Sequence, residues 1–99
     1  MLESTYLECL CLELAAAQVN FQREVPLPVI YKEVRLDCGY RMDLVIEDTV
    51  IVELKAIEQV LPLHEAQLMT YMKLSGKHVG LLMNFNVRLL KNGITRIVL

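Results

Sequence analysis

Two short stretches near the middle of the chain hold the residues best suited to chemistry. Glu53 and Lys55 stand two apart in an apolar run that reads as a strand, so both side chains project from one face of it. If a turn centred on Asp48 joins this strand to the one before it, Asp43 lies directly opposite Glu53, with Cβ atoms about 5 Å apart. A two-residue turn would send the two carboxylates to opposite faces. The chemistry therefore predicts a loop with an odd number of residues.

Two opposed carboxylates on one sheet face repel each other unless a cation compensates them. Lys55 can supply part of that compensation and a divalent metal the rest. Two carboxylates with open positions for water suit Mg²⁺ or Mn²⁺ better than zinc. A lysine beside them can orient an attacking water or offset charge on a phosphoryl oxygen. The alternative is a solvated ion cluster on an exposed sheet face, but the run from Val50 to Leu54 reads as a buried central strand.

Two helices are expected around these residues. Apolar residues recur at three- and four-residue steps between positions 2 and 19, which predicts an amphipathic helix that begins at or before Glu3. Asn20 is a plausible stop for it. A second helix is predicted from Pro62, because proline favours the first turn, to Gly76, because glycine favours helix ends.

The remaining β-rich runs predict the strands of a sheet. The run from Phe21 to Tyr31 contains Pro26 and Pro28, whose missing N–H groups fall on the same lateral side, so it is expected at an edge. The other predicted strands are Val34–Leu36, Tyr40–Ile46, Val50–Lys55, Val79–Met83 and Ile94–Val98. Helix, three or four strands, helix and two strands make an α/β fold with a mixed central sheet flanked by helices, in the order αβββαββ.

Further polar residues are candidates for the same site. Arg41 precedes Asp43 by two positions on the same face and can hold a phosphate, although it can equally pair with Glu53. Gln67 and Tyr71 are one turn apart and share a face of the second predicted helix. The alternative for Tyr71 is a place in the apolar seam of that helix.

Length and composition limit the classes of protein that the chain can represent. Its 99 residues suit one domain, spanning residues 1–99, and a hydrophobic fraction of 55% predicts a packed core. So short a chain cannot hide all of that apolar surface, which predicts a homodimer. The formal net charge of −2 argues against a protein that coats nucleic acid by bulk charge. It leaves room for a small site that cuts nucleic acid, because metal sites are themselves built from carboxylates.

The cysteines and the apolar stretches bear on compartment. Cys9, Cys11 and Cys38 form no disulfide framework and no ligand spacing for zinc, so we expect reduced thiols in the cytoplasm. Charged residues interrupt every long apolar stretch, and no basic-then-apolar leader opens the chain. We therefore expect no association with a membrane.

The order of these motifs resembles the PD-(D/E)XK nuclease superfamily, whose core pairs an Asp on one strand with Glu-x-Lys on the next. Asp43 and Glu53-Leu54-Lys55 match that pattern, and Gln67-Leu-Met-Thr-Tyr71 resembles the Q-x-x-x-Y motif of RecB-like nucleases. Over nearly its whole length the chain resembles a narrower set, the GxxExxY proteins, with Glu3 and Tyr6 matching E-x-x-Y. The glycine that leads that motif in the family would precede Met1.

The resemblance implies a restriction-endonuclease-like core and roles for single residues. Asp43 and Glu53 would hold the metal, with Glu3 completing its shell, although Glu3 can equally serve as a carboxylate favourable to its helix dipole. Gln67 would lie near the metal-bound water or the scissile phosphate, with Tyr71 supporting it. Tyr6 is expected to pack against the core.

These observations predict a Mg²⁺- or Mn²⁺-dependent nuclease that hydrolyses phosphodiester bonds of DNA or RNA. The alternative is a catalytically weak or inactive module that keeps the nuclease fold for binding or assembly. The acidic charge, the short length and the missing motif glycine favour this alternative. Because few basic residues remain to grip a long substrate, nucleic acid is expected to bind weakly.

Overall fold

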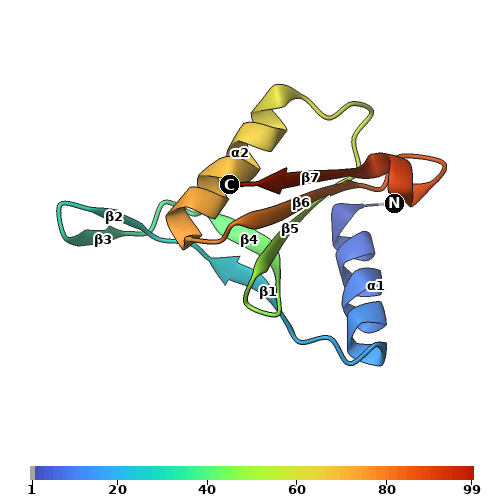
Figure 1. The fold of residues 1–99 in the computed structure, drawn as a ribbon, viewed down its shortest axis with the longest axis horizontal. Coiled ribbons are helices and arrows are strands. Elements are labelled where there is room, and N and C mark those ends of the chain that lie inside the picture. Colours follow the sequence, from blue (N-terminus) through green and yellow to red (C-terminus); the bar gives the residue numbers. More distant parts are fainter. Residues whose placement is uncertain (1) are drawn as a thin grey trace.

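A computed structural model describes residues 2–99 and places seven strands, two α-helices and one short 3₁₀ helix in that range (Figure 1). In chain order they are α1 (Glu3–Ala16), β1 (Phe21–Pro26), β2 (Val29–Tyr31), β3 (Val34–Leu36), β4 (Arg41–Ile46), β5 (Val50–Lys55), α2 (Pro62–Ser75), β6 (Val79–Asn84), η1 (Leu90–Gly93) and β7 (Ile94–Val98). The predicted α/β class with a mixed central sheet is confirmed.

Five strands form the central sheet, in the spatial order β1-β4-β5-β6-β7. The pair β5–β6 is parallel, and the other pairs in this sheet are antiparallel. The parallel pair needs a crossover connection, and α2 supplies it. Strands β2 and β3 form a separate hairpin that projects from the body at the left of Figure 1.

The two helices cover opposite faces of the central sheet (Figure 1). Neighbouring residues on β4 and β5 belong to different cores because side chains alternate along a strand. The core under α1 contains Leu7, Cys11, Leu44, Val52, Leu54 and Met83. The core under α2 contains Val45, Ile51, Leu68, Tyr71, Met72 and Leu82. The strand β5 is therefore buried on both faces, as its apolar sequence indicates.

The helix bounds agree with the prediction at three of four ends. α1 begins at Glu3, and α2 runs from Pro62 to Ser75 with Gly76 in the left-handed region at φ 73°. The first helix ends at Ala16, earlier than predicted, because Gln18 also takes a left-handed φ of 59° and turns the chain toward β1. No helix among residues 2–99 is long and apolar enough to cross a membrane.

The prediction of one strand from Phe21 to Tyr31 was wrong. β1 ends at Pro26, where the Leu27 N–H donates to the Tyr40 carbonyl at 2.9 Å, and the chain then leaves the sheet for the β2–β3 hairpin. Two prolines so close together remove the donors that a continuous ladder would need. The hairpin closes through Lys32 and Glu33, both at positive φ, as a two-residue turn requires. The expectation of an edge strand is confirmed, since β1 pairs only with β4 in the described sheet.

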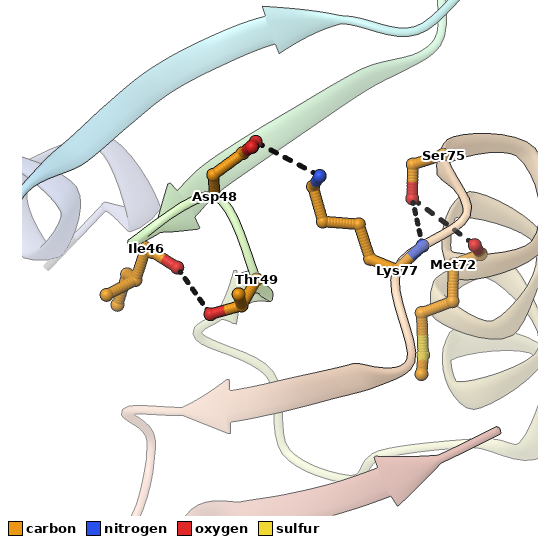
Figure 2. A network of polar contacts seen from close by, with 6 residues as sticks. All are labelled: Ile46, Asp48, Thr49, Met72, Ser75 and Lys77. Atoms are coloured by element: carbon orange, nitrogen blue, oxygen red, sulfur yellow. Dashed lines mark hydrogen bonds and ion pairs between the residues drawn. The ribbon is translucent and has the colours of Figure 1, made fainter.

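The turn between β4 and β5 has the odd length that the chemistry required. Leu44 pairs with Val52 and Ile46 with Val50, which leaves the three residues 47–49 in the loop. Figure 2 shows how this turn is held: the Lys77 ammonium pairs with the Asp48 carboxylate at 3.1 Å, and the Thr49 hydroxyl donates to the Ile46 carbonyl at 3.3 Å. Because Lys77 follows α2, the contact ties the turn to the end of the crossover.

Candidate active site

The ladder between β4 and β5 opens where the predicted catalytic residues stand. The two strands pair only through 44–46 and 50–52, while β4 pairs with β1 as far as Arg41 and β5 pairs with β6 as far as Lys55. The strands therefore part beyond Leu44, and their next residues are Asp43 and Glu53. The register that sets these two residues opposite each other is the predicted one.

A hollow of about 450 Å³ lies at this opening. It collects side chains from α1, the strand ends and α2, and every site residue predicted from the sequence lines it. The lining residues are Glu3, Gly39, Arg41, Asp43, Glu53, Lys55, Gln67 and Tyr71. Their roles in a reaction stay predictions, but the fold brings all of them to one place.

Hydrogen bonds to the backbone fix the two carboxylates of the opening. The Asp43 N–H donates to Glu53 Oε1 at 3.1 Å, and the Leu54 N–H donates to Asp43 Oδ2 at 2.9 Å. Beyond Leu44 the backbone ladder between β4 and β5 has ended. There, a carboxylate oxygen of each strand accepts a backbone N–H of the other strand in place of a carbonyl. One oxygen of each carboxylate is used in this way, so the other can meet a ligand in the hollow.

Burial raises the pKa of both acids, and the charge of Asp43 adds to the rise at Glu53. The pKa of Glu53 rises to about 7, first because its side chain is buried and then because the Asp43 charge is close. The Asp43 N–H and the Lys55 ammonium oppose this rise. Burial likewise raises the pKa of Asp43, against the Leu54 N–H and Lys55. A cation placed between the two acids would favour their charged forms.

The donor chemistry of this pair fits a hard divalent cation. Two backbone-oriented carboxylates supply oxygen ligands, and water and a phosphate oxygen can complete the shell of Mg²⁺ or Mn²⁺. Across residues 2–99, no three His, Cys, Asp or Glu side chains are close enough together to hold an ion. Glu3 lines the hollow without joining Asp43 and Glu53 in such a group, so its role as a third ligand stays a prediction.

The two α2 residues that line the hollow, Gln67 and Tyr71, differ in their exposure to solvent. Gln67 is exposed, one turn before Tyr71, whose side chain is only 5% exposed. The pKa of the Tyr71 hydroxyl is raised by its burial and then by the charges of Glu53 and Asp43. Tyr71 therefore belongs both to the apolar seam of α2 and to the hollow, so the two readings of this residue are compatible.

Arg41 is exposed on the rim of the hollow. The ion pairs found within residues 2–99 join Arg23 with Glu8 and Glu24, and Lys77 with Asp48. The expected alternative, a pair between Arg41 and Glu53, is thus not formed among the described residues. Arg41 remains available for a phosphate.

Other residues support the site without touching the hollow. Tyr6 stacks on Phe85 with ring centroids 4.5 Å apart, which confirms that it packs against the core. The buried Asn84 amide donates to the Ile57 carbonyl at 3.0 Å and accepts the Ile57 N–H at 3.1 Å. It thereby holds the segment that follows Lys55. The sequence signal for this role was a polar residue at the end of an apolar strand.

The sequence reasoning also missed Tyr40 and the part that His64 plays at the start of α2. The Tyr40 ring lies 5.8 Å from the Tyr71 ring, at a tilt of 53°, next to Arg41 on the rim. His64 Nδ1 accepts the Leu61 N–H at 2.9 Å and so helps to begin α2. An aromatic residue beside a predicted site residue was the available signal for Tyr40, but which way its ring points depends on the fold.

Comparisons with known proteins agree with this geometry. A family model described as the PD-(D/E)XK nuclease superfamily matches residues 1–97. Among solved structures, an alkaline exonuclease (LHK-Exo) from Laribacter hongkongensis superposes with a TM-score of 0.60 at 17% identity. The match covers 95% of this chain and 55% of that one, so the chain spans about half the length of the exonuclease. At this identity the likeness concerns the fold alone. A comparison with curated protein sequences finds no match.

Proposed function

Because the chain belongs to the PD-(D/E)XK nuclease superfamily, we propose that the hollow is a nuclease site that hydrolyses phosphodiester bonds of DNA or RNA with Mg²⁺ or Mn²⁺. One observation carries this proposal. The buried Glu53 and the half-buried Asp43, each with a carboxylate oriented by a backbone N–H, share the hollow with Lys55. Membership of the narrower GxxExxY family stays a prediction.

Each residue in the hollow has a distinct part in this proposal. Asp43 and Glu53 would hold the metal, which when bound supplies an activated water and polarises a phosphoryl oxygen. Lys55 projects from the same face of β5 as Glu53 and offsets charge that develops on the phosphoryl group. The exposed amide of Gln67 faces the same space and can position water or phosphate by hydrogen bonds. Arg41 can bind a neighbouring phosphate from the rim.

The charges around the hollow support weak binding of nucleic acid. Its lining supplies two cations, Arg41 and Lys55, against the carboxylates of Glu3, Asp43 and Glu53. Affinity for a phosphate backbone depends on the number of such cations near it. A bound divalent ion would reverse the local sign of the field at the place where the phosphate must lie. We keep the cytoplasm as the proposed location, on the basis of the cysteine content.

A homodimer is also part of the proposal, and the free edges of the sheet support it. β1 carries three features that discourage pairing with another strand: a left-handed φ of 52° at Glu24, the charge of Arg23, and Pro26. The opposite edge, β7, has exposed Ile94 and Val98, contains no proline, and has Arg96 as its one charged residue. A second copy that pairs along β7 would cover this edge.

The test is a cleavage assay on labelled DNA and RNA oligonucleotides, run with Mg²⁺, with Mn²⁺ and with a chelator. We expect metal-dependent cleavage that Lys55→Ala and Asp43→Asn each abolish. The matched control is Lys73→Ala, because Lys73 is an exposed lysine of α2 that does not line the hollow. Cleavage that survives in Lys55→Ala would contradict the proposed site.

The second candidate function is a binding or assembly module that keeps the nuclease fold. The observation in its favour is the surplus of carboxylates over cations in the hollow. It predicts that the purified protein binds a partner or itself but cleaves no member of the oligonucleotide panel with either metal. Cleavage lost in Asp43→Asn and kept in Lys73→Ala would reject it.

A further inference from the structure

Tyr40 presents an aromatic ring beside the hollow, between the lining residues Gly39 and Arg41 in the chain. It is 38% exposed, although its ring contacts that of the buried Tyr71, which lines the hollow. Its backbone is held as well, because the Tyr40 carbonyl accepts the Leu27 N–H at 2.9 Å. One part of the ring is thus supported by protein while another part is open to solvent.

The small number of cations at the hollow indicates what this ring can contribute to binding. Arg41 and Lys55 are the cations that line the hollow, whereas proteins that grip a duplex neutralise many phosphates at once. Stacking of a base on an aromatic side chain contributes about 1–3 kcal/mol per base, and it needs no additional cation. A site poor in basic residues can therefore gain affinity through an exposed ring next to its phosphate-binding groups.

We propose that Tyr40 is a stacking platform for the base of an unpaired nucleotide whose phosphate lies at Arg41 and at the cation that the carboxylate pair would hold, so that the substrate is single-stranded nucleic acid or a frayed end. This inference rests on the proposed nuclease function and names its substrate class. Inside a duplex both faces of a base are covered by its neighbours, so a ring at the rim can stack only on a base that has left the helix.

Cleavage kinetics on matched substrates give the first test. The wild-type chain is expected to cut a single-stranded oligonucleotide with at least tenfold higher kcat/KM than the same sequence in a blunt duplex. Tyr40→Leu should raise KM for the single strand about tenfold with a smaller change in kcat, and Tyr40→Phe should restore it. The matched control is Tyr31→Leu, which removes another exposed tyrosine from the β2–β3 hairpin, outside the hollow.

An abasic substrate separates stacking from a general effect on folding. Removing the base beside the cleaved phosphate should weaken wild-type cleavage about tenfold and leave Tyr40→Leu unchanged, because that variant has no ring to lose. Equal rates on single strand and duplex, or a KM unaffected by Tyr40→Leu, would overturn the inference while the nuclease proposal stands.

Binding decides the inference even if no cleavage occurs. In the Lys55→Ala background, fluorescence anisotropy of a labelled single strand with Mg²⁺ should show about tenfold weaker affinity when Tyr40→Leu is added. If Tyr40→Leu leaves the affinity unchanged, the stacking platform is overturned. If Tyr40→Leu weakens the affinity but the wild-type chain cleaves no substrate, the nuclease proposal alone is rejected. Thermal melts of each variant establish that it is folded.

Discussion

At the scale of single residues, the two neighbouring carboxylates of the hollow lower the stability of the folded chain. Glu53 is 6% exposed and faces another carboxylate, and the hydrogen bond from the Asp43 N–H offsets only part of that cost. Two like charges brought together in a buried place destabilise the folded chain unless a cation joins them. The buried position of Glu53 beside Asp43 therefore indicates a role in binding a ligand, because it does not stabilise the fold.

The pH dependence of stability follows from this cost. The Glu53 pKa is about 7 in the folded chain, above its ordinary value of 4.5, so folding is favoured by protonation. The resulting stability is fully present below pH 4.5 and is lost as the pH rises through 7. With a chelator present, Glu53→Gln should therefore be more stable than the wild type at pH 8, by about 3 kcal/mol at most, and no more stable at pH 4.

Urea unfolding of both chains at the two pH values measures this difference. The glutamine oxygen can still accept the Asp43 N–H, so the local hydrogen bond is retained. Adding Mn²⁺ at pH 8 should stabilise the wild-type chain and leave Glu53→Gln nearly unchanged. If Glu53→Gln is less stable than the wild type at pH 8 without metal, the charged Glu53 side chain does not destabilise the fold.

At the scale of elements, α2 lies unusually close to β6 at Gly80. A Cβ added there would lie 2.7 Å from Met72 Sδ and 3.1 Å from two methyl carbons of Leu68. Both neighbours are almost fully buried, so they have little room to move. Gly80 thus allows the close approach that sets Gln67 and Tyr71 over the ends of the strands.

Gly80→Ala is therefore expected to destabilise the chain by about 1–3 kcal/mol through overpacking. Chemical denaturation measures the loss, and a double variant with Met72→Ala should lose less than the sum of the single variants. Strict additivity would show that the contact between α2 and β6 is not the cause. Because α2 carries part of the hollow, cleavage by Gly80→Ala should also fall.

The sequence predicted these elements well where local chemistry decides them. Pro62 and Gly76 marked α2, and the pairing demanded by Asp43 and Glu53 implied the odd turn. Prediction from the sequence failed where a local structure depends on contacts with residues far away in the chain. The two prolines interrupt the ladder, but the end of β1 at Pro26 also depends on the bond between Leu27 and Tyr40, and the ring position of Tyr40 depends on Tyr71 on another element. No local pattern reports such contacts.

At the scale of the whole molecule, the unequal edges of the sheet make a prediction about assembly. The Leu99 N–H donates to the His78 carbonyl at 2.9 Å. Because alternate residues of an antiparallel edge strand point their N–H groups outward, the Val98 N–H faces away from β6 and that of Ile97 faces toward it. An outward N–H can be removed without breaking the sheet.

Val98→Pro should therefore convert a dimer into a folded monomer, as measured by light scattering and a thermal melt. Ile97→Pro is the matched control, and it should destabilise the fold itself because it removes a bond to β6. A wild-type chain that stays monomeric at high concentration, or a Val98→Pro chain that stays dimeric, would exclude pairing along β7.

The three-residue turn between β4 and β5 has a consequence for how this chain can change over generations. The loop at 47–49 joins strands whose pairing sets Leu44 opposite Val52, and a slip of one residue between them would turn every side chain of one strand to the other face. The Asp43 carboxylate would then leave Glu53, and each core would lose its members on that strand. Insertions at this surface loop are thus tolerated where the added residues leave this pairing in place. Lineages that keep the hollow should keep Leu44 opposite Val52 whatever the length of the loop, whereas the β2–β3 hairpin, which projects from the body, carries no such requirement.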